Sequence, residues 1–322
     1  MKEQVMRLIA GCLVLISVSL LPATAGAAEK YPSKPITFII PFSGGGTITN
    51  TIRSLAPLLE KDLGVPFVIV EKAGGWGAVG WRALQVEAPD GYTLGAVSKS
   101  LYGATVNTKG KVDYKNFDPV VMLCAANFGI TVNVESPWND LKAFIKSAKE
   151  NPGKIRAATA GTASLWHMAL LSFNKAAGVD ITHIPFKSGG ECFTAVLGNH
   201  VESTFSTPSD FPGALETGKL RILAIGSEKR NPYYPDVPTI KEATGLDVVM
   251  GNWWGVIAPK GVPKDRLEIL DRAFAKAVKS PQYLELMKSN KMGSDFVGST
   301  EFSKFYLQDA EVVINYTKTI VQ

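Results

Sequence analysis

Short runs of valine, isoleucine and other apolar residues alternate with helical patterns along almost the whole chain. Such runs are typical of strands that are covered on both faces, as in parallel sheets with helices above and below. Because strands that are connected by helices form mostly parallel sheets, the alternation predicts an α/β protein. The expected strands are residues 36–41, 66–71, 92–97, 155–159, 181–185, 201–205 and 220–225.

The segments between these strands carry helix signals. Ser164 is expected to cap a helix that ends at Gly178. Ser136 followed by Pro137 predicts a second helix start, because proline is favoured at the first helical position. Pro57 lies inside an otherwise helical segment and is expected to kink or shorten it, since proline lacks a backbone N–H.

The chain is long enough for two lobes. Its 322 residues exceed the roughly 100–200 residues of an ordinary domain, and no low-complexity linker separates two halves. We therefore expect the chain to cross between the lobes more than once, at the extended apolar stretches 119–127 and 247–255. This predicts a two-lobed clamshell in which residues 29–126 and 252–322 form lobe 1 and residues 127–251 form lobe 2.

The first 28 residues have the layout of a secretory signal peptide. Lys2 and Arg7 precede an uncharged run at 8–21, and small residues follow Pro22. The uncharged run is shorter than the roughly 20 residues that span a bilayer. We expect cleavage between residues 25 and 28 and a mature protein that is exported and soluble.

Export leaves two cysteines in the mature chain, Cys124 and Cys192. An oxidising compartment would allow them to pair, but two cysteines so far apart in sequence are more often separate buried thiols. His167, His183 and His200 show no short ligand spacing, so we expect no metal site.

Four loops rich in glycine and hydroxyl residues follow predicted strands and precede predicted helices. Glycine lets the backbone approach a ligand closely, and a helix N-terminus offers unpaired N–H groups with a partial positive charge. Together these features make an anion site that needs no arginine. Glycine is also common at strand–helix turns for geometric reasons alone, but four such loops at one cleft favour ligand binding. The loops are residues 41–50, 74–80, 160–164 and 186–190.

Cofactor and catalytic motifs are weak in this chain. Residues 75–80 match G-x-G-x-x-G, yet the following strand ends at Ser98-Lys99-Ser100 without the acidic residue that binds ribose. There is no G-x-S-x-G elbow, and no acidic residue is placed to orient His167 beside Ser164. We therefore expect no cofactor and no enzymatic activity.

The charged residues suggest no macromolecular partner. The 34 basic and 29 acidic residues are mixed along the chain, so the net charge of +5 does not single out nucleic acid or an anionic membrane. Loop carboxylates such as Asp210 and Glu216 have no apolar sequence context that would separate their pKa values.

Four tryptophans lie in or beside the glycine loops or the second crossing. A tryptophan at such a place either packs beneath the loop or lines a cleft with an aromatic face that stacks on a planar or apolar ligand. Both interpretations stay open for Trp76, Trp166, Trp253 and Trp254.

A series of motifs, in order along nearly the whole mature chain, resembles the substrate-binding receptors of tripartite tricarboxylate transporters, also called Bug-type receptors. These motifs are Y-P-S-K-P-I at 31–36, P-F-x-x-G-G at 41–46, E-K-A-G-G-x-G-x-x-G at 71–80, P-D-G-Y-T-L at 89–94, H-I-P-F-K at 183–187, P-D-V-P-T at 235–239 and W-W-G at 253–255.

The resemblance implies a periplasmic binding protein with a type II-like clamshell fold, which closes on a small carboxylate and delivers it to a membrane permease. A monomer without cofactor is expected. In this family the loop that matches residues 42–49 holds a carboxylate, and further loops surround the rest of the ligand. The expected ligand contacts are Phe42, Ser43, Gly45, Gly46, Thr47, Thr49, Gly75, Trp76, Gly77, Ala78, Thr162, Ser164, His167, Lys187, Ser188, Gly189, Ser206 and Thr207.

Departures from the family pattern bear on the ligand. Ile48-Thr49 stands where the family often has Thr-Asp, which argues against an amino-acid ammonium group and makes the wall more apolar. Ser43 replaces a proline, and Trp76 replaces a small residue. We therefore expect a mono- or dicarboxylate with an aromatic or apolar body, not citrate or an amino acid. A receptor that signals to a membrane partner, or an exported hydrolase acting through Ser164, stays as an alternative.

Overall fold

The computed structural model describes residues 30–42, 47–162, 164–186 and 189–321. The chain divides into two units, and every helix and strand that is described lies in the second, Lys34–Gln322. The predicted signal peptide and its cleavage site lie outside the described residues. No helix within the described ranges combines the length and the apolar character that crossing a bilayer requires.

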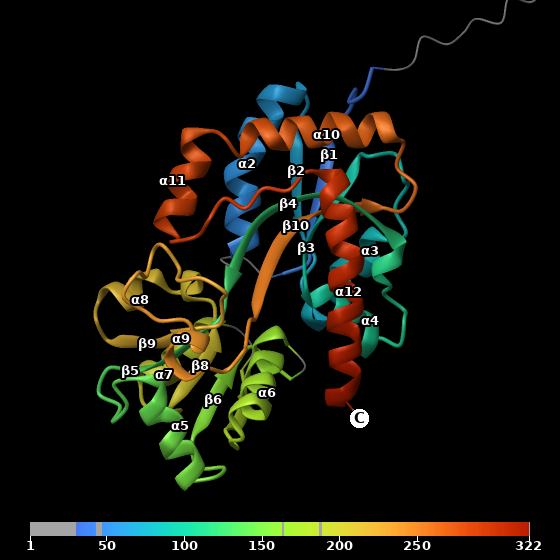
Figure 1. The fold of residues 1–322 in the computed structure, drawn as a ribbon. Helices are drawn as coiled ribbons and strands as arrows, with labels where there is room; N and C mark the ends of the chain where they lie inside the picture. The colour runs from blue at the N-terminus through green and yellow to red at the C-terminus, as the bar shows by residue number, and fades with distance from the viewer. Residues whose placement is uncertain (1–29, 43–46, 163, 187–188, 322) are drawn as a thin grey trace, which may run out of the picture. The chain divides into compact units, whose positions relative to one another are not determined.

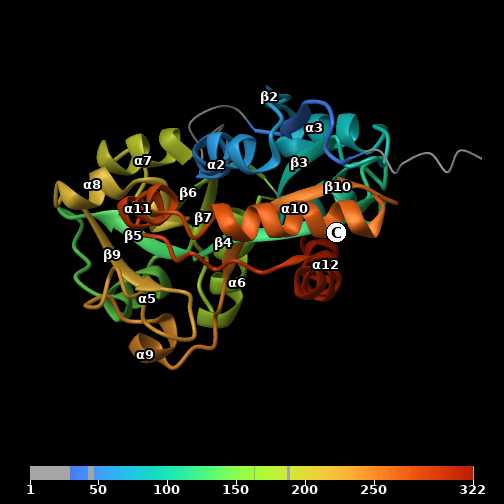
Figure 2. The same ribbon diagram turned by 90° about the horizontal axis from the view of Figure 1, so that it is seen from above.

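The first sheet has five strands in the order β2-β1-β3-β10-β4. Helices α2 and α3 lie on one side of it, and α12 lies on the other (Figure 1, Figure 2). The strands are β1 (Ile36–Ile40), β2 (Phe67–Glu71), β3 (Thr93–Ser98), β4 (Phe117–Asn127) and β10 (Gly251–Pro259). The accompanying helices are α2 (Thr47–Leu63), η1 (Gly75–Gly77), α3 (Ala78–Leu84), α4 (Ser100–Asn107), η2 (Tyr114–Asn116), α10 (Lys264–Ala277), α11 (Pro281–Ser289) and α12 (Ser299–Val321).

The second sheet also has five strands, in the order β7-β6-β8-β5-β9. The strands are β5 (Gly129–Asn133), β6 (Arg156–Thr159), β7 (Thr182–Pro185), β8 (Ser203–Ser206) and β9 (Leu220–Ile225). The accompanying helices are α5 (Leu141–Glu150), α6 (Leu165–Ala177), α7 (Gly189–Leu197), η3 (Pro208–Asp210), α8 (Pro212–Glu216) and α9 (Ile240–Thr244).

The strand directions confirm the prediction of mostly parallel sheets. In the first sheet β10 is antiparallel to both of its neighbours, while the other four strands share one direction. In the second sheet β5 is the reversed strand. Both reversed strands follow a crossing from the other sheet. They therefore enter at the edge where the parallel strands end, which fixes their opposite direction.

The crossings lie close to the expected stretches. Strand β4 ends at Asn127 and β5 begins at Gly129, so only Phe128 separates the two sheets there. The chain returns through α9 and enters the first sheet again at Gly251. The lobe boundaries at 126/127 and 251/252 stay a prediction.

One predicted helix start is wrong. Helix α5 begins at Leu141, and its cap is Asp140, whose side chain accepts a hydrogen bond from the Ala143 N–H at 2.8 Å. Ser136 is not the cap, because the chain between it and Asp140 forms bends instead of a helix and buries Trp138 edge-on against Phe144, with ring centroids 5.1 Å apart.

The other helix predictions fare differently. Ser164 caps α6 as expected, accepting from the His167 N–H at 3.2 Å, and Gly178 ends the helix in a left-handed conformation. Pro57 does not shorten α2, which runs over 17 residues with the proline inside it. Because Pro57 lies on the exposed side of α2, water can reach the carbonyl group that has lost its helical N–H partner.

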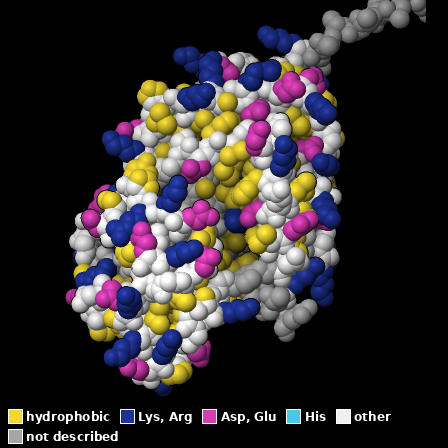
Figure 3. Space-filling model, in the orientation of Figure 1, with side chains coloured by type: hydrophobic (Ala, Val, Ile, Leu, Met, Phe, Trp, Pro, Cys, Tyr) yellow, Lys and Arg dark blue, Asp and Glu magenta, His cyan; other side chains and the backbone are white. Residues whose placement is uncertain are grey.

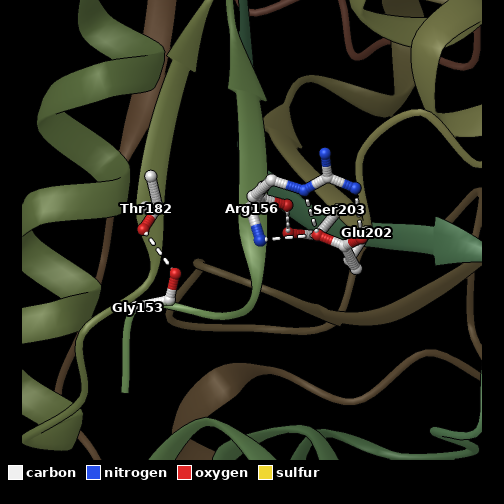
Figure 4. Close-up of polar contacts among 5 residues, drawn as sticks. All are labelled: Gly153, Arg156, Thr182, Glu202 and Ser203. Carbon is white, nitrogen blue, oxygen red and sulfur yellow. Dashed lines mark hydrogen bonds and ion pairs between the residues drawn. The ribbon is translucent and has the colours of Figure 1, made fainter. Parts of the chain in front are cut away.

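Polar contacts fix the strands of the second sheet to one another (Figure 4). The Arg156 guanidinium makes two hydrogen bonds to Glu202, with Nε to Oε2 at 3.0 Å and Nη2 to Oε1 at 2.7 Å, and the Arg156 N–H donates to Oε2 as well. The Ser203 hydroxyl donates to the Arg156 carbonyl at 3.3 Å, and the Thr182 hydroxyl to the Gly153 carbonyl at 2.9 Å. Cys124 and Cys192 are separate buried thiols, as expected.

The observed cap of α5 gives a direct test of the fold. Replacing Asp140 with alanine is expected to lower the free energy of unfolding by about 1 kcal/mol, because the Ala143 N–H loses its acceptor. Ser136→Ala is the matched control: the Ser136 hydroxyl is buried without a hydrogen-bond partner in the described part of the chain, so its loss should cost little. Urea unfolding of both variants makes the comparison, and equal losses would contradict the assignment of the cap.

Candidate functional site

The carboxyl ends of six parallel strands meet around one cavity. Strands β1, β2 and β3 of the first sheet are parallel to each other, and so are β6, β7 and β8 of the second. The loops that leave these strands therefore converge from both sheets. In open α/β sheets this is the edge at which ligands bind.

The cavity at this edge has a volume of about 450 Å³, which suits a small organic ligand. Each glycine-rich loop predicted from the sequence contributes at least one residue to it. The lining comprises Pro41, Phe42, Thr47, Ile48, Ala73, Gly74, Gly75, Gly77, Ser98, Ser100, Ala160, Ser164, Leu165, Trp166, Gly189, Asp210, Asn252 and Trp254.

A larger cavity of about 800 Å³ lies on the opposite face of β10. Successive side chains of a strand point to opposite faces, so Trp253 lines the larger cavity and Trp254 the smaller one. Figure 3 shows the larger cavity as a hollow with apolar side chains between β10 and α12. We assign the ligand site to the smaller cavity, because the glycine loops and the ends of the parallel strands surround that one.

Helix N-termini give the smaller cavity its electrostatic character. The first residues of α2 and α4, Thr47 and Ser100, line it, as do Ser164 at the cap of α6 and Gly189 at the start of α7. The N–H groups at these ends carry partial positive charge and favour an anion. No lysine, arginine or histidine is present among the described residues that line the cavity.

Asp210 is the one ionisable side chain among those lining residues. Its Oδ1 accepts a hydrogen bond from the Thr47 hydroxyl at 3.0 Å, and its Oδ2 accepts one from Thr207. Burial by the surrounding protein raises the pKa of the Asp210 carboxyl to about 6, although these two hydrogen bonds oppose the shift. The expectation that nothing separates the pKa values of the two carboxyls is therefore wrong for Asp210. Both residues are exposed, and Glu216 forms an ion pair with Lys291 at 3.2 Å.

Six of the predicted contacts line the cavity: Phe42, Thr47, Gly75, Gly77, Ser164 and Gly189. Thr207 is buried beside the cavity, and its hydroxyl donates a hydrogen bond to Asp210. The buried hydroxyls of Thr49 and Ser206 have no hydrogen-bond partner in the described part of the structure. Neither Ala78 nor Thr162 is among the described lining residues. For Trp76 only the backbone is described, and Ser43, Gly45, Gly46, Lys187 and Ser188 lie outside the described residues.

His167 faces another histidine and is not among the lining residues. Its ring stacks on that of His183, with centroids 3.7 Å apart and an interplanar angle of 13°. The His183 Nε2 lies 2.6 Å from the Thr159 hydroxyl oxygen. Burial lowers the pKa of both rings, to about 4 for His183, where the neighbouring His167 adds to the effect. Two rings that both favour the neutral form stack without charge repulsion.

Glycine in the second loop has a structural role as well. Gly77 has φ = 98°, and a Cβ there would lie 2.7 Å from the Trp81 ring. A Cβ at Gly80 would lie 2.6 Å from the Pro41 Cα and Cβ and 2.9 Å from the Lys72 carbonyl oxygen. Gly80 therefore allows α3 to pack directly on the loop that leaves β1. Both glycines that match the second half of the G-x-G-x-x-G pattern are explained by packing, without a nucleotide.

Sequence reasoning did not select several lining residues. Ser98, Ser100, Asn252 and Asp210 come from segments without glycine-rich loops. Ser98 and Ser100 could have been found, since Ser98 ends β3 and Ser100 begins α4 directly after it, and the carboxyl end of β3 must lie beside those of β1 and β2. Asp210 had no such signal, because its place depends on a contact with Thr47 over 163 residues of sequence.

Comparison with known proteins agrees with this geometry. The family model for the tripartite tricarboxylate transporter family receptor matches residues 51–321. A protein encoded in the gbd 5′ region of Cupriavidus necator is 34% identical over 298 residues, which cover 92% of this chain and 90% of the relative.

Solved structures extend the comparison. A TctC solute-binding protein from Polaromonas, without ligand, matches with a TM-score of 0.75 at 29% identity and covers 90% of this chain and 99% of its own. MatC from Rhodopseudomonas palustris, with bound malate, matches with a TM-score of 0.78 at 25% identity over 89% of this chain and 100% of its own. These likenesses confirm the two-lobed periplasmic-binding-protein fold.

The packing at Gly80 predicts a specific loss of stability. Gly80→Ala is expected to lower the free energy of unfolding by about 1–3 kcal/mol, because the added methyl group overlaps Pro41 and the Lys72 carbonyl. Gly213→Ala, in helix α8, is the control: no atom lies within 4 Å of its added Cβ, so this change should be neutral or slightly stabilising. A Gly80→Ala variant as stable as Gly213→Ala would refute the close packing of α3.

Proposed function

Because the chain belongs to the family of tripartite tricarboxylate transporter receptors, we propose that it is a periplasmic solute-binding receptor. It takes a small carboxylate into the smaller cavity and delivers it to a membrane permease of that transporter type. The malate bound to MatC supports a carboxylate as the ligand class.

The observation that carries this proposal is the set of helix N-termini around a cavity without a described cation. A carboxylate at the start of α2 would meet the Thr47 hydroxyl and the free N–H groups of the first turn. Hydroxyls and backbone dipoles can bind one carboxylate group without the cost of burying a lysine or arginine when the cavity is empty.

The rest of the lining suits an apolar body. Phe42, Ile48, Trp166 and Trp254 line the cavity with aromatic and aliphatic surface. Such surface favours a mono- or dicarboxylate with an apolar or aromatic body over a highly charged tricarboxylate, which would need a donor for every carboxyl group.

The remaining sequence-based assignments belong to the same proposal. Residues 1–28 act as a signal peptide, and the lobes exchange at 126/127 and 251/252. Ligand contacts from both lobes favour the closed form, since a ligand shifts a conformational equilibrium only by its differential affinity for the two states. The predicted contacts that lie outside the described residues, or whose side chains are not described, complete the site.

Thermal shifts of the refolded mature protein test the ligand class. We expect stabilisation by aromatic or apolar mono- and dicarboxylates and little effect of citrate or glutamate. Refolding removes any ligand retained during purification. A response to citrate or glutamate alone would contradict the apolar ligand, and no response to any carboxylate would contradict the receptor's proposed ligand class.

Thr47 gives a residue-level test. Thr47→Val keeps the shape of the side chain but removes its hydroxyl, so affinity for a carboxylate such as benzoate should fall. The limit is about five- to tenfold, the equivalent of one hydrogen bond, because the same hydroxyl also bonds Asp210 in the unliganded protein. Thr194→Val is the control, since that hydroxyl bonds the Gly190 carbonyl within α7 and does not line the cavity. Titration calorimetry compares the variants, and unchanged affinity in Thr47→Val would count against its role.

A further inference from the structure

A carboxylate of the protein itself occupies the anion end of the cavity. Asp210 ends η3, directly after β8 of the second sheet, whereas Thr47 begins α2 beside the first sheet. The hydrogen bond from the Thr47 hydroxyl to Asp210 Oδ1, 3.0 Å long, therefore joins the two sheets across the cavity. Asp210 thus accepts from the same Thr47 hydroxyl that the proposed function assigns to the ligand's carboxylate.

Among the described residues, no cation compensates the charge of Asp210. No described lysine, arginine or histidine forms an ion pair with it, and its described partners are the hydroxyls of Thr47 and Thr207. The titratable neighbour on the adjacent helix α7 is Cys192. Burial, aided by the charges of Glu191 and Asp210, raises the pKa of this thiol to about 12, so it stays neutral.

A ligand carboxylate that binds at Thr47 would lie against the Asp210 carboxylate. Two ionised carboxylates in direct contact repel each other strongly. A single proton shared between the two groups removes this repulsion. A protonated Asp210 would also donate a hydrogen bond to the incoming carboxylate, and bonds of this kind are short and strong.

We propose that Asp210 determines the specificity of the ligand site: it occupies the anion position beside Thr47 in the unliganded protein, and a ligand carboxylate binds there together with one proton that Asp210 takes up. This inference rests on the proposed function and names the regulation of the same site. The chemical class that it selects is a carboxylate bound with one proton, the equivalent of a carboxylic acid.

The environment of Asp210 makes this proton uptake accessible near neutral pH. Asp210 is an exposed residue at the edge of the cavity. The protein around its carboxyl nevertheless raises the pKa of that group to about 6. Above that pH the unliganded site is mostly ionised and must bind a proton with the ligand. Affinity for a carboxylate should therefore be highest below pH 6 and fall by about tenfold for each pH unit above it.

Calorimetry with benzoate, and with adipate as the dicarboxylate probe, tests the inference on the full mature chain between pH 6 and 8. Benzoate stays ionised over this range and adipate from about pH 7 upward, so heats measured under those conditions in buffers of different ionisation enthalpy count the protons taken up by the protein. We expect about one proton per ligand at pH 7.5 for the wild type and none for Asp210→Asn. Since only about 1% of a carboxyl with a pKa near 6 is protonated at pH 8, Asp210→Asn should bind up to roughly 100-fold more tightly there.

Asp236→Asn is the matched control. It removes the same charge from an exposed loop next to the second sheet and should keep the proton uptake and pH slope of the wild type. Binding by the wild type without proton uptake would overturn the role of Asp210 and leave the receptor function intact. This measurement uses the wild type alone, so it does not depend on whether a variant folds. Uptake that persists in Asp210→Asn would assign the proton to another group, which also overturns it. Failure of every carboxylate to bind at any of these pH values would instead overturn the proposed function.

Discussion

The reversed strand β10 is the constraint on which both cavities depend. It lies between β3 and β4, antiparallel to each, and so places two successive tryptophans on opposite faces of the first sheet. Trp253 is almost fully buried and packs edge-on against Tyr102 and Phe302, with ring centroids 6.0 and 5.2 Å away. The same strand places Trp254 in the wall of the smaller cavity, so this wall is anchored directly to the core.

Polar contacts tie this core to α12. The Trp253 indole N–H donates to Asp309 Oδ2 at 2.7 Å, and Lys99 forms an ion pair with Asp309 Oδ1 at 3.0 Å. Lys99 stands between Ser98 and Ser100, two residues that line the ligand cavity. Helix α12 therefore holds the end of β3 in place. It helps to position a loop that lies more than 200 residues earlier in the sequence.

The sequence alone predicts those parts of the fold that depend on local pattern. Continuous apolar runs predict the buried strands, and Ser164 predicts the start of α6 because its cap is made within four residues. The start of α5 was mistaken because burial of Trp138 against Phe144 outweighs the local preference of Ser136-Pro137 for a helix start. The exposure of Pro57 is likewise a tertiary property, which decides whether a proline ends a helix or is tolerated in it.

The same division applies to the site. Glycine and hydroxyl residues after strands predicted four loops that the parallel strands bring together, because strand direction follows from the alternation of elements. The place of Asp210 could not be predicted in this way, because it depends on a hydrogen bond with Thr47, which lies beside the other sheet. Its sequence neighbours, Ser209 and Phe211, give no sign that it faces an anion site.

The chemistry of the cavity follows from what its described walls lack. With helix N-termini and hydroxyls but no described cation, the smaller cavity offers donors to an anion without the cost of burying a lysine or arginine. The carboxylate of Asp210 accepts from two of these hydroxyls, those of Thr47 and Thr207, and so links the two sheets. A ligand carboxylate that enters must bind these donors more favourably than Asp210 does. The free energy of binding is therefore the difference between the interaction free energies of the two carboxylates with the same donors. In a receptor that must also release its ligand, an internal anion of this kind lowers affinity because it stabilises the empty state relative to the bound one.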